Sequence, residues 1–231
     1  GLQQWGAVAL FHGLPSDRVR AITQASDGAM WFGTETGLAR FDGRRTHTIN
    51  DPAVPIGRIL ALHTDKEGGL WVGTEAGAAR LVVNQFLKIN ETAGQSISAI
   101  TTSEAGAVVM TSEQGRIYES RARVITVEDR GLTQSETTTT SRLVVDTREL
   151  LNEPLVSADR ERPGPLVITS VTVTNKRLFI GTLSKGLMEV SNGEARPVQM
   201  RPMVFFVNAL ERDKTGRHGR IMKYNLNVGR A

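Results

Sequence analysis

The residues best placed to do chemistry in this chain are three glutamates that recur at one place in similar stretches of sequence. Glu35 and Glu75 each follow a Gly-Thr pair, and Glu113 follows the corresponding Thr-Ser pair. This recurrence could bring three carboxylates to one face of the protein. A repeated sequence explains it equally well without chemistry, and a fourth stretch has Leu183 at this place. We therefore expect no catalytic residues among them.

The other residue types give no catalytic or metal-binding pattern. The four histidines, His12, His47, His63 and His218, share no spacing typical of a metal site. The chain has no cysteine, which removes disulfides, thiol catalysis and cysteine-ligated zinc. No stretch resembles a nucleophile elbow or a phosphate-binding loop. We expect neither a metal nor a cofactor, and we expect that the chain is not an enzyme.

The elements that carry these glutamates come from an internal repeat. Residues 19–43 read VRAITQASDGAMWFGTETGLARFDG, and residues 59–81 read ILALHTDKEGGLWVGTEAGAARL. Their Gly-Thr pairs begin at Gly33 and Gly73, 40 residues apart. A period of roughly 40 to 45 residues, with short apolar strands and glycine-containing turns, is typical of one four-stranded blade of a β-propeller.

Each copy predicts a β-hairpin followed by a second turn and two further strands. Asp27-Gly28 and Gly68-Gly69 suit a tight turn, because glycine has no Cβ to resist a positive φ angle. The repeated positions that we expect to be structural are Gly28, Trp31, Gly33, Thr34, Gly37, Gly68, Trp71, Gly73, Thr74, Gly77, Gly181, Thr182 and Gly186.

The two tryptophans of the repeat allow two interpretations. Flat aromatic rings can stack against sugars, and they can equally seal the space between neighbouring sheets. Trp31 and Trp71 both lie mid-strand beside a Gly-Thr pair, so we favour packing between blades.

Weaker copies of the repeat follow at residues 97–118 and 171–193, and a last copy starts at Val207 without reaching a Gly-Thr pair. We therefore predict an all-β chain, a partial β-propeller of about four to five four-stranded blades. Residues 121–165 exceed the repeat period and form either a degenerate blade or a polar insertion. The expected segments are residues 1–120 with blades 1 to 3, 121–165, 166–205 with a further blade, and 206–231 with an incomplete blade and a basic tail.

Residues 13–81 resemble the two-component regulator propeller repeat, whose pattern V-x-x-I-x-x-D-x-x-G-x-x-W-x-G-T-x-x-G-L-x-R-x-D-G they follow. Residues 97–118 and 166–193 follow it less closely. The resemblance implies the extracytoplasmic sensor part of bacterial histidine kinases and hybrid two-component systems. It implies a ligand-binding module on the periplasmic or extracytoplasmic side of the inner membrane. The full-length protein would then be membrane-anchored and carry a kinase or other output domain.

The same resemblance sets the expected partners. The ligand is a small molecule, and oligosaccharides are the class to test first. Family members close larger rings, so we expect self-association or pairing with missing blades, because a partial array leaves strand edges exposed. The alternative functions are a propeller-fold hydrolase or lyase, or a protein-interaction scaffold.

The candidate ligand site is one face of the blades. If the hairpin and the second turn connect successive strands of one blade, the second turns share a face with the residues that lead into each blade. The residues that we expect to contact ligand there are Asp17, Arg18, Glu35, Thr36, Arg58, Glu75, Glu113 and Lys185.

The charge is unevenly distributed. The formal net charge is +4, and residues 196–231 carry +6 of it, against −2 for the rest. A basic tail can meet phosphate or an anionic membrane surface, but we interpret it as a solvated end and expect no nucleic-acid partner. No run of 18 apolar residues exists for a membrane-spanning helix, and residues 1–13 lack the features of a signal peptide.

Overall fold

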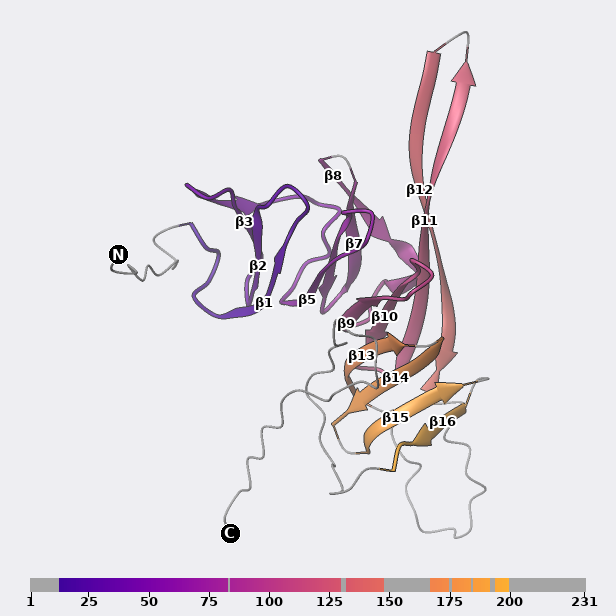
Figure 1. Ribbon diagram of the computed structural model, residues 1–231. Coiled ribbons are helices and arrows are strands. Elements are labelled where there is room, and N and C mark those ends of the chain that lie inside the picture. The colour runs from indigo at the N-terminus through magenta and orange to yellow at the C-terminus, as the bar shows by residue number, and fades with distance from the viewer. Residues whose placement is uncertain are drawn as a thin grey trace, which may run out of the picture. The chain divides into compact units, whose positions relative to one another are not determined.

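The computed structural model describes residues 13–82, 84–129, 132–147, 167–174, 176–183, 185–191 and 194–199, with side chains except at 122–138 and 194. Within them the chain forms four four-stranded antiparallel sheets, in each of which consecutive strands pair (Figure 1). The predicted all-β fold built from propeller blades is confirmed. The blade expected to start at Val207 lies outside the described residues. The chain divides into two compact units, Gly1–Ile97 and Ser98–Ala231.

Blades 1 and 2 belong to the first unit. Blade 1 consists of β1 (Val19–Gln24), β2 (Met30–Thr34), β3 (Leu38–Phe41) and β4 (Thr46–Ile49). Blade 2 consists of β5 (Ile59–Thr64), β6 (Leu70–Thr74), β7 (Gly77–Val82) and β8 (Gln85–Ile89). A short 3₁₀ helix, η2 (Asn90–Thr92), follows blade 2.

The first turn of each blade has the conformation that its sequence predicts. Gly28 and Gly68 have φ angles of 82° and 85°, in the region that side chains with a Cβ resist. The backbone N–H of Gly28 donates to the carbonyl of Ala25, and that of Gly68 to the carbonyl of Asp65, at 3.0 and 3.1 Å. These turns fix the same strand register in both blades.

The threonine of the Gly-Thr pair closes the second turn of each blade. The Thr34 hydroxyl donates to the carbonyl of Gly37 at 2.8 Å, and the Thr74 hydroxyl donates to that of Gly77 at 3.1 Å. Thr182 makes the same bond to Gly186 at 2.8 Å. These three threonines are fully buried, so the bond also satisfies a polar group that water does not reach.

The glycine of the same pair makes room for the next blade. A Cβ built on Gly33 would lie 2.5 Å from Ile59 Cγ2, at the start of β5. A Cβ on Gly73 would lie 2.7 Å from the backbone oxygen of Ile97. Real Cβ atoms do not approach other atoms so closely, so only glycine allows the following strand to pack directly against this position.

The core of the first unit lies between blades 1 and 2. Its larger buried side chains include Trp31, Leu38, Ile59, Leu70 and Phe86. The Trp31 and Phe86 rings meet edge to face, with centroids 6.1 Å apart. Trp31 and Trp71 are 3% and 0% exposed, which fits a packing role and leaves neither ring face free for a sugar.

Blade 2 also contains a buried ion pair. The Asp65 carboxylate accepts hydrogen bonds from Trp71 Nε1 at 2.7 Å and from Arg80 Nη2 at 3.0 Å. The Asp65 and Arg80 side chains are 1% and 4% exposed. The Arg80 guanidinium lies 5.1 Å from the centre of the Trp71 ring, a cation–π distance.

The second unit holds the third and fourth sheets. The third consists of β9 (Ile97–Thr102), β10 (Val108–Ser112), β11 (Arg116–Asp129) and β12 (Leu132–Asp146). The fourth consists of β13 (Ile168–Thr174), β14 (Arg177–Thr182), β15 (Gly186–Ser191) and β16 (Glu194–Pro197). Side chains from both sheets, such as Val109, Ile117, Ile168 and Ile180, form its core.

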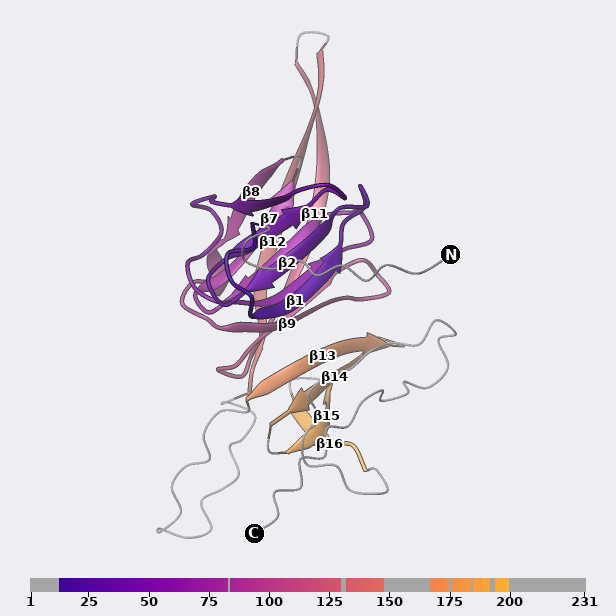
Figure 2. The same cartoon turned by 90° about the vertical axis from the view of Figure 1, so that its left-hand side faces the viewer.

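β11 and β12 form a long hairpin, which Figures 1 and 2 show as a two-stranded ribbon. β11 pairs with β10 only through Ser120, whereas β11 and β12 pair as far as Asp129 and Leu132. Residues 121–146, from the segment that the sequence leaves open, thus lengthen two strands of the third sheet. Residues 148–166 lie outside the described residues.

Adding a methyl group at the interblade glycines should destabilise the first unit. We expect Gly73→Ala to cost about 1–3 kcal/mol in free energy of unfolding, because a backbone carbonyl is in the way and cannot rotate aside. Gly33→Ala should cost a similar amount, since Ile59 Cβ, 2.9 Å away, is fixed to the backbone and cannot rotate aside. Urea unfolding followed by tryptophan fluorescence measures both losses. The signal reports on the first unit, because the three tryptophans, at positions 5, 31 and 71, all belong to it. Unchanged stability in either variant would contradict this account.

The buried ion pair should matter far more than its exposed relative in blade 1, where Arg40 Nη2 binds Asp27 at 2.7 Å. Asp65→Asn leaves the buried Arg80 guanidinium without its carboxylate, and we expect a loss of about 3–5 kcal/mol. Asp27→Asn removes a carboxylate whose side chain is 55% exposed, so the expected loss is about 1 kcal/mol or less. Equal losses in the same urea experiment would show that burial does not set the strength of these pairs.

Candidate functional site

The candidate site lies at one end of blades 1 and 2, where the second turn of each blade meets the residues that lead into it. The backbone N–H of Glu35 donates to the carbonyl of Arg18 at 3.1 Å. The equivalent bond in blade 2 joins Glu75 N–H to the carbonyl of Arg58 at 3.2 Å. The repeat therefore places a glutamate beside an arginine in both blades, as the sequence predicts.

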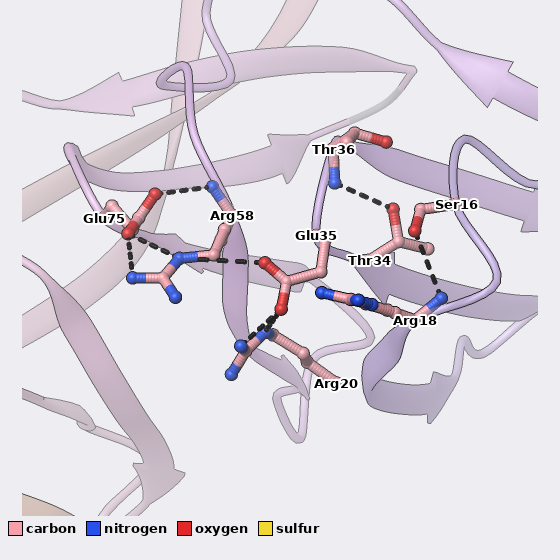
Figure 3. A network of polar contacts seen from close by, with 8 residues as sticks. All are labelled: Ser16, Arg18, Arg20, Thr34, Glu35, Thr36, Arg58 and Glu75. Carbon is pink, nitrogen blue, oxygen red and sulfur yellow. Dashed lines mark hydrogen bonds and ion pairs between the residues drawn. The ribbon is translucent and has the colours of Figure 1, made fainter.

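Arg58 connects the two glutamates (Figure 3). Its Nε donates to Glu75 Oε1 at 2.6 Å, and its backbone N–H donates to Glu75 Oε2 at 3.0 Å. The same Nε lies 3.8 Å from Glu35 Oε2 in blade 1. Arg20 completes the network, with its Nε donating to Glu35 Oε1 at 2.7 Å. We call Arg20, Glu35, Arg58 and Glu75 the turn network.

The turn network is open to solvent. Its side chains are 40% exposed at Arg20, 20% at Glu35, 45% at Arg58 and 34% at Glu75. The hydrogen bonds from the Arg58 side chain and backbone hold the pKa of Glu75 below its usual value. Glu75 is therefore ionised at neutral pH and is unsuited to donate a proton. The network can exchange hydrogen bonds with a polar ligand.

A hollow of about 480 Å³ lies beside the turn network in the same unit. Thr36 and Gly37 line one side of it, and Ile56, Gly57 and Ile59 line another. The Ile56 side chain is 91% exposed, an unusual position for a large apolar group. The hollow thus offers apolar contact within a few residues of the charged groups.

Two other predicted residues of the first unit stabilise the chain around the site. The carbonyl of Asp17 accepts the backbone N–H of Val19 at 3.1 Å. The Thr36 hydroxyl donates to the carbonyl of Pro15 at 2.8 Å, so it fastens the segment that leads into β1. Thr36 also lines the hollow.

Arg18 presents an exposed cation at the same place. Its backbone N–H donates to Ser16 Oγ at 3.1 Å, and among the described residues its guanidinium has no carboxylate partner. Figure 3 shows its side chain on the same side of the turn as Glu35 and Arg20.

Glu113 and Lys185 lie in the second unit, at the equivalent turns of their sheets. The Lys185 backbone N–H donates to the Thr182 hydroxyl at 3.0 Å, and the turn that contains Glu113 is closed by Gly115 N–H donating to the Ser112 carbonyl at 3.0 Å. Both side chains are exposed. The turn network itself is formed by first-unit residues.

Sequence reasoning missed Arg20, because the repeat has Leu60 at the equivalent position and no recurrence marks it. The signal that could have found it is the strand pattern. The residue after Val19 lies beside the turn that follows Thr34, since Val19 and Thr34 are partners in the sheet.

In the part of the chain that the structure describes, no group of three or more histidine, aspartate or glutamate side chains is arranged to hold a metal ion. The same residues contain no helix that is long and apolar enough to cross a membrane.

Acid should weaken the first unit partly through Glu75. The pKa of Glu75 is lower in the folded chain than in the unfolded one, so the unfolded chain binds the proton first as pH falls. The stabilisation is therefore complete above about pH 4.5 and disappears as pH falls through the lowered pKa. We expect Glu75→Gln to flatten the curve of Tm against pH between about pH 6 and 3. Glu67→Gln, at an exposed turn glutamate, is the control, and identical slopes for the two variants would refute the assignment.

Comparison with known proteins agrees with the repeat. The family model of the two-component regulator propeller matches residues 13–36 and 53–76, which contain the first two strands of blades 1 and 2. A search of curated proteins by sequence finds no matching relative.

Solved structures share the fold. The extracellular domain of the hybrid two-component system BT3049 from B. thetaiotaomicron aligns with a TM-score of 0.60 and 18% identity, over 91% of this chain and 28% of that one. The extracellular domain of BT4673 from the same organism aligns with a TM-score of 0.54 and 16% identity, over 87% and 26%. Virginiamycin B lyase from Staphylococcus aureus aligns with a TM-score of 0.51 and 11% identity, over 80% and 56%.

These identities are low, so the likeness to solved structures shows the propeller fold alone. The chain spans about a quarter of the two extracellular domains, at 28% and 26% of their lengths, and 56% of the lyase. The likeness to the two-component regulator propeller rests instead on the repeat, whose Gly-Thr turns and interblade glycines the structure explains. The chain therefore contains two segments, residues 13–36 and 53–76, that match the two-component regulator propeller repeat.

Proposed function

We propose that this chain is a ligand-sensing propeller module of a bacterial two-component signalling protein, located on the extracytoplasmic side of the membrane. The observation that carries the proposal is the bridge formed by Arg58. It binds Glu75 of its own blade and lies 3.8 Å from Glu35 of the preceding blade. A ligand that exchanges hydrogen bonds with Arg58 acts on two blades at once.

The composition of the site favours a neutral ligand with many hydroxyl groups. Arginines and glutamates alternate there, so a ligand with a large net charge meets repulsion as well as attraction. Sugar hydroxyls donate to carboxylates and accept from guanidinium groups, and therefore suit both. The adjacent hollow with Ile56 supplies apolar contact for a sugar ring face. Oligosaccharides are the ligand class that we propose.

The site is less suited to hydrolysis. A glycosidase of the usual kind needs one carboxyl group that stays protonated near neutral pH. Arg58 acts in the opposite direction on Glu75, because it lowers the pKa of that carboxyl group. We therefore place the chain among binding modules rather than among propeller enzymes.

In the signalling mechanism that we propose, occupancy changes the relation between neighbouring blades or between protomers, and an output domain such as a histidine kinase reads this change. A few kcal/mol of differential binding suffices to shift such an equilibrium. Pairing with a second copy or with further blades remains a prediction, which sedimentation of the chain measures.

The test is a thermal-shift and calorimetric titration of the 231-residue chain with di-, tri- and tetrasaccharides of glucose, mannose, xylose and arabinose. We expect at least one of them to raise Tm, because a ligand that binds only the folded state stabilises it. Substituting Arg58→Gln should weaken that binding about tenfold or more, as expected for a lost charge-assisted contact. Substituting Arg18 and Arg58 together should abolish it and leave the fold intact.

The matched control is Arg142→Gln. It removes another exposed arginine–glutamate pair, between Arg142 and Glu119 at 2.7 Å, in the second unit. Its binding should equal that of the natural chain. Unchanged affinity in the Arg58→Gln variant and in the variant that lacks both Arg18 and Arg58 would refute the site. Absence of any response across the panel would refute oligosaccharide sensing by this chain.

A further inference from the structure

Blades 1 and 2 each have a buried tryptophan at the same place in the repeat, but they differ in what accepts a hydrogen bond from its indole N–H. In blade 2 the Asp65 carboxylate receives three hydrogen bonds, from Trp71 Nε1 at 2.7 Å, Arg80 Nη2 at 3.0 Å and the backbone N–H of Gly69 at 2.7 Å. This set of donors holds a carboxylate that is almost completely buried.

Blade 1 keeps the donors and lacks this carboxylate. Ala25 stands where the repeat places Asp65, 40 residues earlier. Trp31 Nε1 is buried and has no hydrogen-bond partner in the described part of the chain. Arg40 and the Ala29 backbone N–H, the counterparts of Arg80 and Gly69, bind instead to Asp27 in the exposed turn, at 2.7 and 3.0 Å.

A pocket of about 670 Å³ opens at this place, between blades 1 and 2. Its volume is within the range of sites for small organic molecules. Ala25 and Trp31 line it together with Asp27 and Arg40, and Asn50 and Asn84 add amide groups.

We propose that this pocket binds a small hydroxylated carboxylate. Its carboxyl group accepts hydrogen bonds from Trp31 Nε1 and Arg40, as the Asp65 carboxylate does from Trp71 and Arg80 in blade 2. Asp27 then moves out to solvent. This movement costs little free energy, because the Asp27 side chain is already 55% exposed. The hydroxyl groups of the ligand bind the two asparagines. This pocket is separate from the turn network and does not depend on it.

Ala29 sets where the ligand oxygen can lie. At the equivalent Gly69, a Cβ would come within 2.7 Å of Asp65 Oδ2 and of Arg80 Nη2. Ala29 has this Cβ, so a carboxylate in blade 1 must lie farther toward the pocket than Asp65 does in blade 2. Ala25 in place of an aspartate therefore leaves room for a carboxylate from outside, and the Cβ of Ala29 confines that carboxylate to the pocket side of the position.

The indole N–H signals of the three tryptophans in a ¹⁵N–¹H spectrum of the 231-residue chain test the proposal directly. Trp31→Phe identifies the Trp31 signal. Sodium glucuronate is the probe, glucose is the neutral counterpart, and sodium chloride keeps the ionic strength constant. We expect the Trp31 signal to shift saturably with glucuronate, with no shift from glucose and none of the Trp71 signal.

Two kinds of variant sharpen the test. Ala25→Asp combined with Ala29→Gly rebuilds the arrangement of blade 2 and should weaken glucuronate binding at least tenfold, whereas Ala29→Gly alone should retain it. Asp27→Asn removes the competing carboxylate and should tighten binding several-fold. Arg58→Gln should have no effect, which separates this site from the turn network.

An unmoved Trp31 signal, or an equal shift with glucose, would overturn the proposal. Weaker binding in Asp27→Asn would also overturn it, because Asp27 would then be a ligand contact rather than a competitor. The titration of the natural chain decides the matter alone if the rebuilt variant fails to fold.

Discussion

The close approach of successive strands at the glycine of the Gly-Thr pair is the constraint on which the rest of the first unit depends. Ile59, the first residue of β5, packs where Gly33 has no Cβ. Arg58 immediately precedes Ile59, so the same contact brings its guanidinium to Glu35 of the other blade. The packing of two sheets and the charged surface at their end are thus one arrangement. A larger residue at position 33 would push the two sheets apart and would also move Arg58 away from Glu35.

The neighbouring threonine gives this arrangement its rigidity. Its buried hydroxyl spans the second turn and leaves the following glutamate at the surface, with its backbone N–H bound to the residue that leads into the blade. A short side chain with one rotatable hydroxyl suits this place, because a longer group would not fit within the turn. Ser112 stands at the corresponding place in the third sheet, where its Oγ accepts the Arg116 backbone N–H at 3.1 Å.

Divergence between copies of the repeat marks the places where the blades can acquire separate roles. Blade 2 uses Asp65 and Gly69 to bury an ion pair beneath Trp71, whereas blade 1 has alanine at both positions and a pocket in their place. At the other end, Arg20 replaces a leucine and adds a second arginine to Glu35. Internal copies of this kind act as their own controls, because the backbone and register are held constant while single side chains change.

The amino-acid sequence by itself determined the elements of this protein. The 40-residue spacing, the two glycine turns and the alternation of apolar residues are local properties, so the four-stranded blades and their structural glycines, threonines and tryptophans followed from them. The sequence also placed Glu35, Glu75 and Arg58 at one end of the blades, because a turn and a strand start have fixed positions within a repeat.

Only the tertiary structure decided which side chains meet. The bridge from Arg58 to Glu35 and the pairing of Arg20 depend on how two sheets pack, and no periodicity specifies that distance. The missing acceptor of Trp31 is likewise a property of the space around Ala25. The repeat did not predict the length of β11 and β12. How far two strands pair depends on contacts between them, and the sequence of one strand alone does not specify these contacts. Local pattern fixes elements, whereas contacts between residues far apart in the chain arise when their surfaces are buried together.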